Sequence, residues 1–322
     1  MANKTVNMVE ALNMALAGEM ERDSNVVILG EDVGVDGGVF RVTAGLYGKF
    51  GPERVMDTPL AESGIVGMAI GMAAFGLVPV AEIQFMGFLY PAFDQLISNA
   101  SRIRARSRGR YGCPMVVRTP YGGGIKAIEL HSESAEAAFC HIPGLKVVVP
   151  SSPYTAKGLL AAAVRDPDPV LFLEPTRLYR LIKEEVPEEP FTIPLGKARL
   201  VKEGRNATLI SWGSMLQKTI KAAEAYDVDV IDLMTLSPYD EDAVLASVKK
   251  TGRAVIIQEA PRNCGFASEV AAGIAEKAIL SLKAPVIRVA GYDVVLPFPK
   301  LEDFYIPNQR RITDAIEEVL KY

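Results

Sequence analysis

The chain has 322 residues, 49% of them hydrophobic and 23% charged, and a formal net charge of −4. This length predicts two domains, and the slightly acidic balance argues against a nucleic-acid partner. The three cysteines form no CxxC pair, which argues against a zinc site or a disulfide framework and fits a reducing compartment. The first residues lack the pattern of a secretory signal, so we expect a cytoplasmic protein with no membrane partner.

Helices and strands are predicted to alternate through the first half of the chain. Apolar residues recur at helical spacing over 5–21. Further helices are predicted over 61–75, 91–107 and 153–164, and strands over Val26–Leu29, 78–85, Pro114–Arg118, Leu145–Val149 and Val170–Leu173. Such alternation is typical of a parallel sheet with helices on both of its faces.

The predicted helix over 61–75 is apolar on all sides. Gly76 and Pro79 end it well before the ~20 residues that a membrane span needs. A helix without a polar face is expected to be buried on every side. Gly64, Gly67 and Gly71 fall on one face, where they would let another backbone approach closely.

Three acidic or imidazole side chains are candidates for a site. Glu62, in the first turn of that helix, either stabilises the helix start or binds a ligand through its carboxylate. Glu31 follows a buried strand, at the edge where open α/β sheets bind ligands. His131 follows the loop 122–124, which is all glycine, and is either structural or a proton-handling group near neutral pH. The five arginines over 102–110 indicate a solvated helix end or a contact with an acidic partner chain.

The composition changes at 184–196, where three prolines and four glutamates indicate a linker. We therefore predict a first domain over 1–188, a linker over 189–200 and a second domain over 201–322. The second domain repeats the alternation, with strands predicted over 207–212, 228–233, 254–258 and 286–289, and helices over 214–226, 240–249, 268–281 and 308–320.

Six motifs in order carry a resemblance to one family: GEDVG at 30–34, DTPLAESG at 57–64, EIQF and PAFDQ within 82–95, ELHSES at 129–134, PGLKVVVPSSPYTAKGLL at 143–160 and FYIPNQRRI at 304–312. The chain resembles the beta subunit of the thiamine-diphosphate-dependent, decarboxylating first component of a 2-oxo acid dehydrogenase complex, of the pyruvate or branched-chain type. The resemblance implies an α/β fold of two three-layer domains with parallel sheets. The first would be a pyrimidine-binding domain and the second a transketolase C-terminal-like domain.

The resemblance also implies roles for particular residues. Glu62 would bond N1′ of the cofactor's aminopyrimidine and promote removal of the thiazolium C2 proton, after which the thiazolium serves as an electron sink. Phe88 would pack against the aminopyrimidine, Leu60 would contact it, and Glu31 would lie near Glu62. His131 would stand at the reaction centre and assist acyl transfer to lipoamide.

The chain differs from the family pattern at one position near the cofactor, and the resemblance also implies a metal site. Pro91 stands where relatives often carry Gln or Glu, so no proton relay is expected at that position. Related chains hold a structural potassium ion. The matching ligands here are the carbonyls of Met115, Ala163 and Val164, together with Asp166 and Asp168.

The resemblance implies partners as well. No GDG segment, which begins the motif that binds magnesium and diphosphate, occurs in the chain, so an alpha subunit is expected to hold the Mg²⁺ within an α2β2 assembly. The glycine face of the 61–75 helix would pack between two beta chains. The second domain would dock the lipoyl acyltransferase core, and the substrate would be a 2-oxo acid. The alternatives are a stand-alone transketolase-like or deoxyxylulose-phosphate synthase-like enzyme, or a non-catalytic docking subunit.

Overall fold

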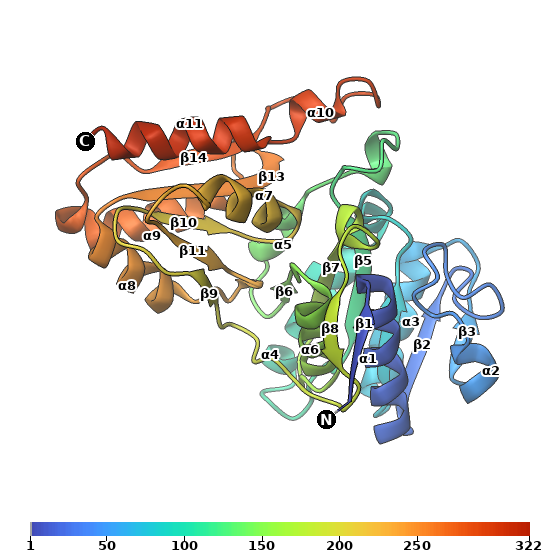
Figure 1. Ribbon diagram of the computed structural model, residues 1–322. Helices are drawn as coiled ribbons and strands as arrows, with labels where there is room; N and C mark the ends of the chain where they lie inside the picture. Colours follow the sequence, from blue (N-terminus) through green and yellow to red (C-terminus); the bar gives the residue numbers. More distant parts are fainter. Residues whose placement is uncertain (1) are drawn as a thin grey trace.

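The computed structural model describes residues 2–322 as two α/β units joined by an extended segment (Figure 1). The first half contains β1 (Asn3–Val6), α1 (Met8–Arg22), β2 (Val26–Gly30), α2 (Leu46–Phe50), β3 (Val55–Asp57), α3 (Glu62–Ala74), β4 (Val78–Glu82), α4 (Ile103–Arg106), β5 (Val116–Tyr121), α5 (Glu136–Cys140), β6 (Lys146–Val148), α6 (Pro153–Val164), β7 (Val170–Pro175) and β8 (Glu184–Pro187).

The second half contains β9 (Arg199–Lys202), β10 (Thr208–Ser211), α7 (Ser214–Ala223), β11 (Asp229–Asp232), β12 (Thr235–Ser237), α8 (Glu241–Thr251), β13 (Ala254–Pro261), α9 (Ala267–Ala278), β14 (Ile287–Gly291), α10 (Glu302–Tyr305) and α11 (Gln309–Leu320). Short 3-10 turns cover Met86–Ala92, Ala100–Arg102, Glu129–His131, Thr176–Leu178 and Ile279–Ser281, and a π turn covers Gln95–Asn99.

The first sheet has the order β12-β6-β7-β5-β4-β2-β3, and only β12 runs antiparallel to its neighbour. Its apolar residues alternate between the two faces. Val80 and Val116 pack toward α1 and α6, whereas Ala81 and Val117 pack toward the α3 side. Successive strand side chains point to opposite faces, so a strand covered by helices on both sides is apolar throughout.

The second sheet has the order β14-β13-β10-β11-β9, with only β9 antiparallel. In Figure 1, α7 and α11 lie on one face of this sheet, and α8 and α9 on the other. The predicted fold of two three-layer domains built on parallel sheets is therefore confirmed.

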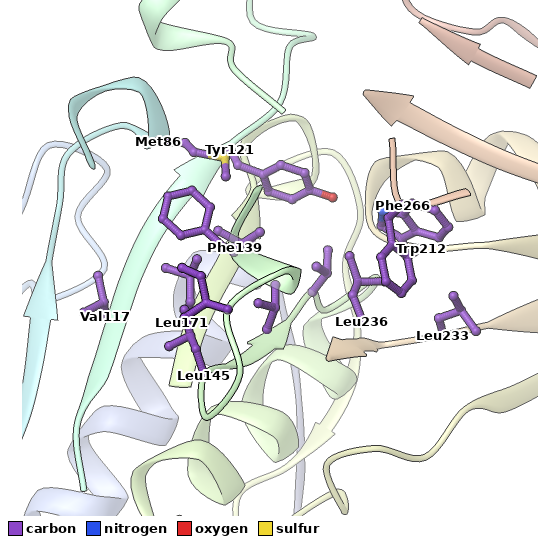
Figure 2. Packing of buried hydrophobic residues seen from close by; sticks show 14 of the residues in the cluster. Met86, Val117, Tyr121, Phe139, Leu145, Leu171, Trp212, Leu233, Leu236 and Phe266 are labelled. Atoms are coloured by element: carbon purple, nitrogen blue, oxygen red, sulfur yellow. The ribbon is translucent and has the colours of Figure 1, made fainter. Parts of the chain in front are cut away.

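One apolar cluster continues from the first domain into the second. Figure 2 shows Phe139 and Tyr121 on one side of the junction and Trp212 and Phe266 on the other, with Leu236 between them. β12, which lies in the second half of the sequence, is the last strand of the first sheet. The two domains consequently share a core and are held in one arrangement.

The structure corrects several of the predicted elements. The helix predicted over 91–107 is broken into 3-10, π and α turns, and Pro91, which has no N–H to donate, lies inside the 3-10 segment Met86–Ala92. The strand predicted over 78–85 ends at Glu82. β1 and β8 were not predicted, and they pair with each other in a small antiparallel sheet.

α3 is not buried on every side, in contrast to the prediction. Gly64 and Gly71 are exposed, and the side chains of Met68 and Phe75 on the same face are 41% and 94% exposed. No other segment between residues 2 and 322 provides the close backbone contact that the glycines were expected to make. In the same range, none of the helices has the length and apolarity needed to cross a bilayer.

Candidate active site

The predicted site residues follow four neighbouring parallel strands at the same edge of the first sheet. Gly30 of β2 pairs with Asp57 of β3 and with Glu82 of β4, and Glu82 pairs with Arg118 of β5. The four strands therefore end side by side. The segments that leave them carry the candidates, and this edge is where ligands bind in open α/β sheets.

His131 lies among aromatic rings on this edge. Its ring centroid is 4.4 Å from that of Phe85 and 5.0 Å from that of Phe88, and the contact with Phe88 is edge-to-face. Gly87 makes this possible, since a β-carbon built on it would lie 2.3 Å from the Leu130 carbonyl oxygen. The structure thus brings the predicted pair Phe88 and His131 together, with Phe85 as a neighbour that the sequence did not single out.

The acidic residues form a second group on the edge. Burial, followed by the neighbouring carboxylates of Glu62 and Asp32, raises the pKa of the Glu31 carboxyl. Two charged carboxylates in proximity disfavour each other, so this arrangement lets Glu31 hold a proton at higher pH than a free glutamate does. The Glu62 carboxylate is thus close enough to Glu31 to act on the pKa of its carboxyl.

Glu62 begins α3 and is partly exposed on this open side. The adjacent Ser63 donates its hydroxyl to the Pro91 carbonyl, which ties the start of α3 to the 3-10 segment carrying Phe88. Leu60, just before the helix, is 79% exposed. Leu60 therefore exposes an apolar side chain two residues before the Glu62 carboxylate.

A buried ionic network supports the edge from below. Arg118 donates two hydrogen bonds to Glu174, at 2.7 and 2.8 Å, and a third to Glu82. Tyr179 donates to the same Glu174 carboxylate at 2.5 Å. Because Glu82, Arg118 and Glu174 lie on β4, β5 and β7, the network fixes the ends of β4 and β5, from which the segments with Phe88 and His131 depart. Sequence reasoning missed it, since these three charged residues are each isolated in an apolar strand.

The predicted potassium residues lie together around the α6–β7 turn, but their carboxylates are already paired. Lys146 Nζ is 2.7 Å from Asp166 Oδ1, and Arg104 Nε is 2.6 Å from Asp168 Oδ1. The Met115 carbonyl accepts the Val170 N–H at 3.0 Å. Within residues 2–322 no cluster of three or more acidic, His or Cys side chains could hold a metal. The two carboxylates are thus paired with cationic side chains, and the potassium site stays a prediction.

A cleft of about 1190 Å³ lies elsewhere, at the junction of the two domains. It is lined by residues such as Phe93, Ile142, Pro238 and Phe266, and none of the predicted site residues borders it. The candidate site is instead an open surface. Exposed apolar side chains surround it, among them Val35, Leu60 and Ile128. An exposed apolar surface of this kind indicates contact with another molecule.

Comparison with known proteins defines the class. The model of the transketolase pyrimidine-binding domain matches residues 4–182, and that of the transketolase C-terminal domain matches residues 196–312. A solved split-gene transketolase, described as an inactive beta4 tetramer, superposes with a TM-score of 0.80 over 99% of both chains at 22% identity, which shows the fold. The chain is thus a two-domain protein of the transketolase type.

Curated relatives define the family. The pyruvate dehydrogenase E1 component subunit beta of Staphylococcus epidermidis is 51% identical over 98% of this chain and 99% of its own length. The corresponding subunit of Acholeplasma laidlawii is 50% identical over 98% of both chains, and that of Staphylococcus aureus is 49% identical. The chain belongs to this family, the beta subunits of the thiamine-diphosphate-dependent first component of 2-oxo acid dehydrogenase complexes.

The residues present fit the pyrimidine end of that cofactor. Thr58 Oγ1 and His131 Nδ1 are buried polar atoms that have no hydrogen-bond partner among residues 2–322. Buried polar groups are normally paired, so both are available to a ligand or to a partner chain. Thr58 lies on the segment that carries Glu62, and the His131 ring packs against Phe88. The GDG segment, which begins the motif for magnesium and diphosphate, does not occur in the chain.

Proposed function

We propose that the chain is the beta subunit of a pyruvate dehydrogenase, active only when it is assembled with an alpha subunit. The observation that carries the proposal is the open edge of the first sheet, where Glu62 lies near Glu31 and Phe88 packs on His131. The reaction would be oxidative decarboxylation of a 2-oxo acid, with transfer of the acyl group to lipoamide. Relatives of the pyruvate type, at 49–51% identity, favour pyruvate over branched-chain substrates.

Each residue of the edge has a definite task in this proposal. Glu62 accepts and returns a proton at N1′ of the aminopyrimidine, and Glu31 lies beside it. Phe88 and Leu60 present apolar surface to the ring. When bound, thiamine diphosphate supplies the electron sink that decarboxylation requires. His131, held against Phe85 and Phe88, is placed to handle a proton near the reacting carbon during acyl transfer.

The alpha subunit completes the site. It would supply the groups that hold Mg²⁺ and the diphosphate, and it would cover the exposed apolar side chains around the edge, such as Leu60 and Ile128. The exposed face of α3, with Gly64, Gly71 and Phe75, is suited to packing between two beta chains in an α2β2 assembly. Both surfaces are apolar and uncovered, as expected for a subunit of an obligate complex.

The second domain would dock the lipoyl acyltransferase core. An apolar turn at Ile279 and Leu280, exposed by 57% and 100%, offers a contact on this domain. A stand-alone transketolase-like enzyme would need the diphosphate half within the same chain. A purely docking subunit would have no use for a paired acid group and an aromatic-packed histidine on an open sheet edge.

The test is copurification with an alpha subunit from the same organism, followed by assay against a panel of 2-oxo acids. The proposal expects Mg²⁺-dependent and thiamine-diphosphate-dependent oxidation, faster with pyruvate than with branched-chain acids, and acyl transfer to a lipoyl domain. Preference for branched-chain acids would instead identify the chain as the beta subunit of a branched-chain 2-oxo acid dehydrogenase. Ketol transfer between sugar phosphates, without 2-oxo acid oxidation, would favour the transketolase-like alternative.

A further inference from the structure

The loop between β5 and α5, residues 122–133, carries His131 and makes two backbone contacts with the second domain. The Gly123 N–H donates to the Glu259 carboxylate near the end of β13. The Lys126 N–H donates to Glu302 Oε2 at the start of α10, at 3.1 Å. The base of the loop is closed by a hydrogen bond from the Gly122 N–H to the Glu133 carbonyl, at 2.8 Å. The loop is therefore held from outside its own domain.

Glycine is required where the loop meets the second domain. Gly122 has φ +78°, and a β-carbon built on it would lie 2.8 Å from Glu259 Oε1. A β-carbon on Gly123 would lie 2.9 Å from Ile306 Cδ1. The carboxylate reaches the loop backbone only because these positions have no side chain. Gly122 and Gly123 of the triple glycine are thus explained by contact with the second domain, whereas a β-carbon on Gly124 would meet Arg177 of the first domain, 2.8 Å away.

Glu259 is buried, and its hydrogen bonds are divided between the two domains. One oxygen accepts the Gly123 N–H, and the other accepts the Ser214 hydroxyl at the start of α7. Burial raises the pKa of the Glu259 carboxyl, whereas those two hydrogen bonds and the nearby Lys218 and Arg177 act in the opposite direction. A buried carboxylate is costly unless it is hydrogen-bonded. Loss of the hydrogen bond from Gly123 would therefore leave a buried carboxylate oxygen without a partner, which is energetically unfavourable.

The path from Glu259 to His131 is short and continuous. From Gly123 the chain passes Lys126, whose N–H is held by Glu302, and reaches the 3-10 turn Glu129–His131, where the His131 N–H donates to the Ile128 carbonyl at 3.0 Å. On the other side of His131, Tyr90 donates to the Glu133 carboxylate at 2.8 Å. The imidazole is set by its backbone and by the Phe85 and Phe88 rings, because Nδ1 has no partner within residues 2–322.

We propose that Glu259 is a positioning residue of the second domain, which holds the backbone of the loop 122–133 and thereby fixes His131 on the open edge of the first sheet. This inference rests on the proposed role of His131 in acyl transfer. It gives the second domain a part in the reaction, although none of its residues is among those expected to contact the cofactor. A misplacement of about 1 Å in a reacting group can cost on the order of 10²-fold in rate.

The experiment uses the assembled enzyme and two assays, acyl transfer to a lipoyl domain and decarboxylation with an artificial electron acceptor. Glu259→Ala removes the bond to Gly123 and should lower lipoyl transfer on the order of 10–10²-fold, with a much smaller loss in the other assay. Glu259→Gln keeps an acceptor for the Gly123 N–H and should restore transfer. Asp303→Ala is the matched control, because Asp303 meets the same loop only through an exposed ion pair with Lys126.

The decisive arm is a double-mutant cycle with His131→Ala. If Glu259 acts through His131, adding Glu259→Ala to His131→Ala causes no further loss of lipoyl transfer, whereas independent effects multiply. Multiplied losses, or equal losses of Glu259→Ala in both assays, would overturn the inference while leaving His131 its role. If His131→Ala itself lowers both assays equally, the proposed role of His131 fails, and the inference fails with it.

Should Glu259→Ala not assemble, Glu302→Ala serves as the second variant. It removes the acceptor of the Lys126 N–H, and it is expected to show the same split between the assays and the same absence of further loss in the His131→Ala background. Assembly is checked by size and by melting temperature before either assay. A Glu302→Ala enzyme that assembles normally and transfers acyl groups at the wild-type rate would contradict the claim that the second domain holds the loop.

Discussion

The carboxyl edge of the first sheet is open, whereas that of the second sheet is covered by the first domain. On the second sheet, Asp232 at the end of β11 accepts a hydrogen bond from Ser151 at 2.8 Å, and Trp212 after β10 donates to Glu136 at 3.3 Å. On the first sheet, Leu60 and Ile128 are exposed. The two sheets are built alike, but the carboxyl edge of the second sheet packs against the first domain, whereas that of the first sheet remains accessible.

The same difference separates the buried acids at the domain junction, which form hydrogen bonds across the contact between domains, from the acid on the open edge. Burial raises the pKa of Asp232 to about 6 and that of Glu136 to about 7, and both lie against the other domain. Glu31, whose pKa is also raised, lies on the open edge instead, and the Glu62 carboxylate contributes to the shift. Perturbed acids are associated with functional sites. Asp232 and Glu136 are fully buried between the domains, whereas Glu31 lies at the open edge and keeps a small exposed fraction.

The largest expected effect concerns Glu62. Glu62→Gln keeps the size and a hydrogen-bonding group but removes proton exchange, and it should lower turnover of the assembled enzyme by about 10²–10⁴-fold. Fold and assembly should be retained, because a neutral amide is cheaper to bury than a charge. The C2 proton exchange of bound cofactor, followed by NMR after acid quench, measures the step. Exchange at the wild-type rate would leave Glu62 with only a structural role at the helix start.

A pair of substitutions compares the two edges directly. Trp212→Ala, at the covered edge, should lower the free energy of unfolding by about 3–5 kcal/mol, as expected for loss of a large buried side chain. Leu60→Ala, at the open edge, should change it by less than about 0.5 kcal/mol in the isolated chain. Denaturant unfolding of both variants measures the contrast. Similar losses in the two would mean that the edges do not differ in packing.

A smaller effect is expected for the pH dependence of stability. The ordinary pKa of the Glu136 carboxyl is 4.5, and burial raises it to about 7 in the folded chain. Between these values the folded state binds more protons than the unfolded state, so stability falls as the pH rises through this window and levels off above it. Glu136→Gln should remove the contribution of Glu136 to this slope and add on the order of 1–3 kcal/mol at high pH. Asp232, whose pKa burial raises to about 6, still contributes below that value.

Unfolding in denaturant at several pH values between those two pKa values measures the slope. Glu53→Gln is the matched control, because Glu53 is exposed in the same domain. The groups that face Glu136 include Trp212, Tyr121, Cys140, Glu259 and Tyr305. The amide oxygen of the variant can still accept the hydrogen bond from Trp212. A Glu136→Gln slope equal to that of the control would show that Glu136 does not titrate in this range.

Much of the fold could be predicted because its strands are short apolar runs. Val26–Leu29 and Val170–Leu173 are buried on both faces, and such runs bounded by turns indicate strands of a parallel sheet. β1 and β8 could not be predicted in this way. They are short and largely exposed, and the pairing joins Asn3 to Pro187, far along the chain.

The site was predicted in part. The resemblance placed Glu62, Phe88 and His131, and the structure brings Phe88 and His131 into contact. Glu259 could not be found, because a single acid near the end of an apolar strand gives no sign of a partner 136 residues away. The exposed side of α3 was missed for a related reason, since apolar residues predict burial but not whether the same chain provides the cover.

The most direct test of the central claim is binding of thiamine diphosphate, measured by calorimetry with Mg²⁺ on the isolated chain and then on the chain assembled with its alpha subunit. The open edge offers groups for the pyrimidine, and the chain lacks the GDG segment for the diphosphate. The account predicts no binding by the isolated chain at micromolar concentration and Mg²⁺-dependent binding by the assembly. Tight Mg²⁺-dependent binding by the isolated chain would contradict it.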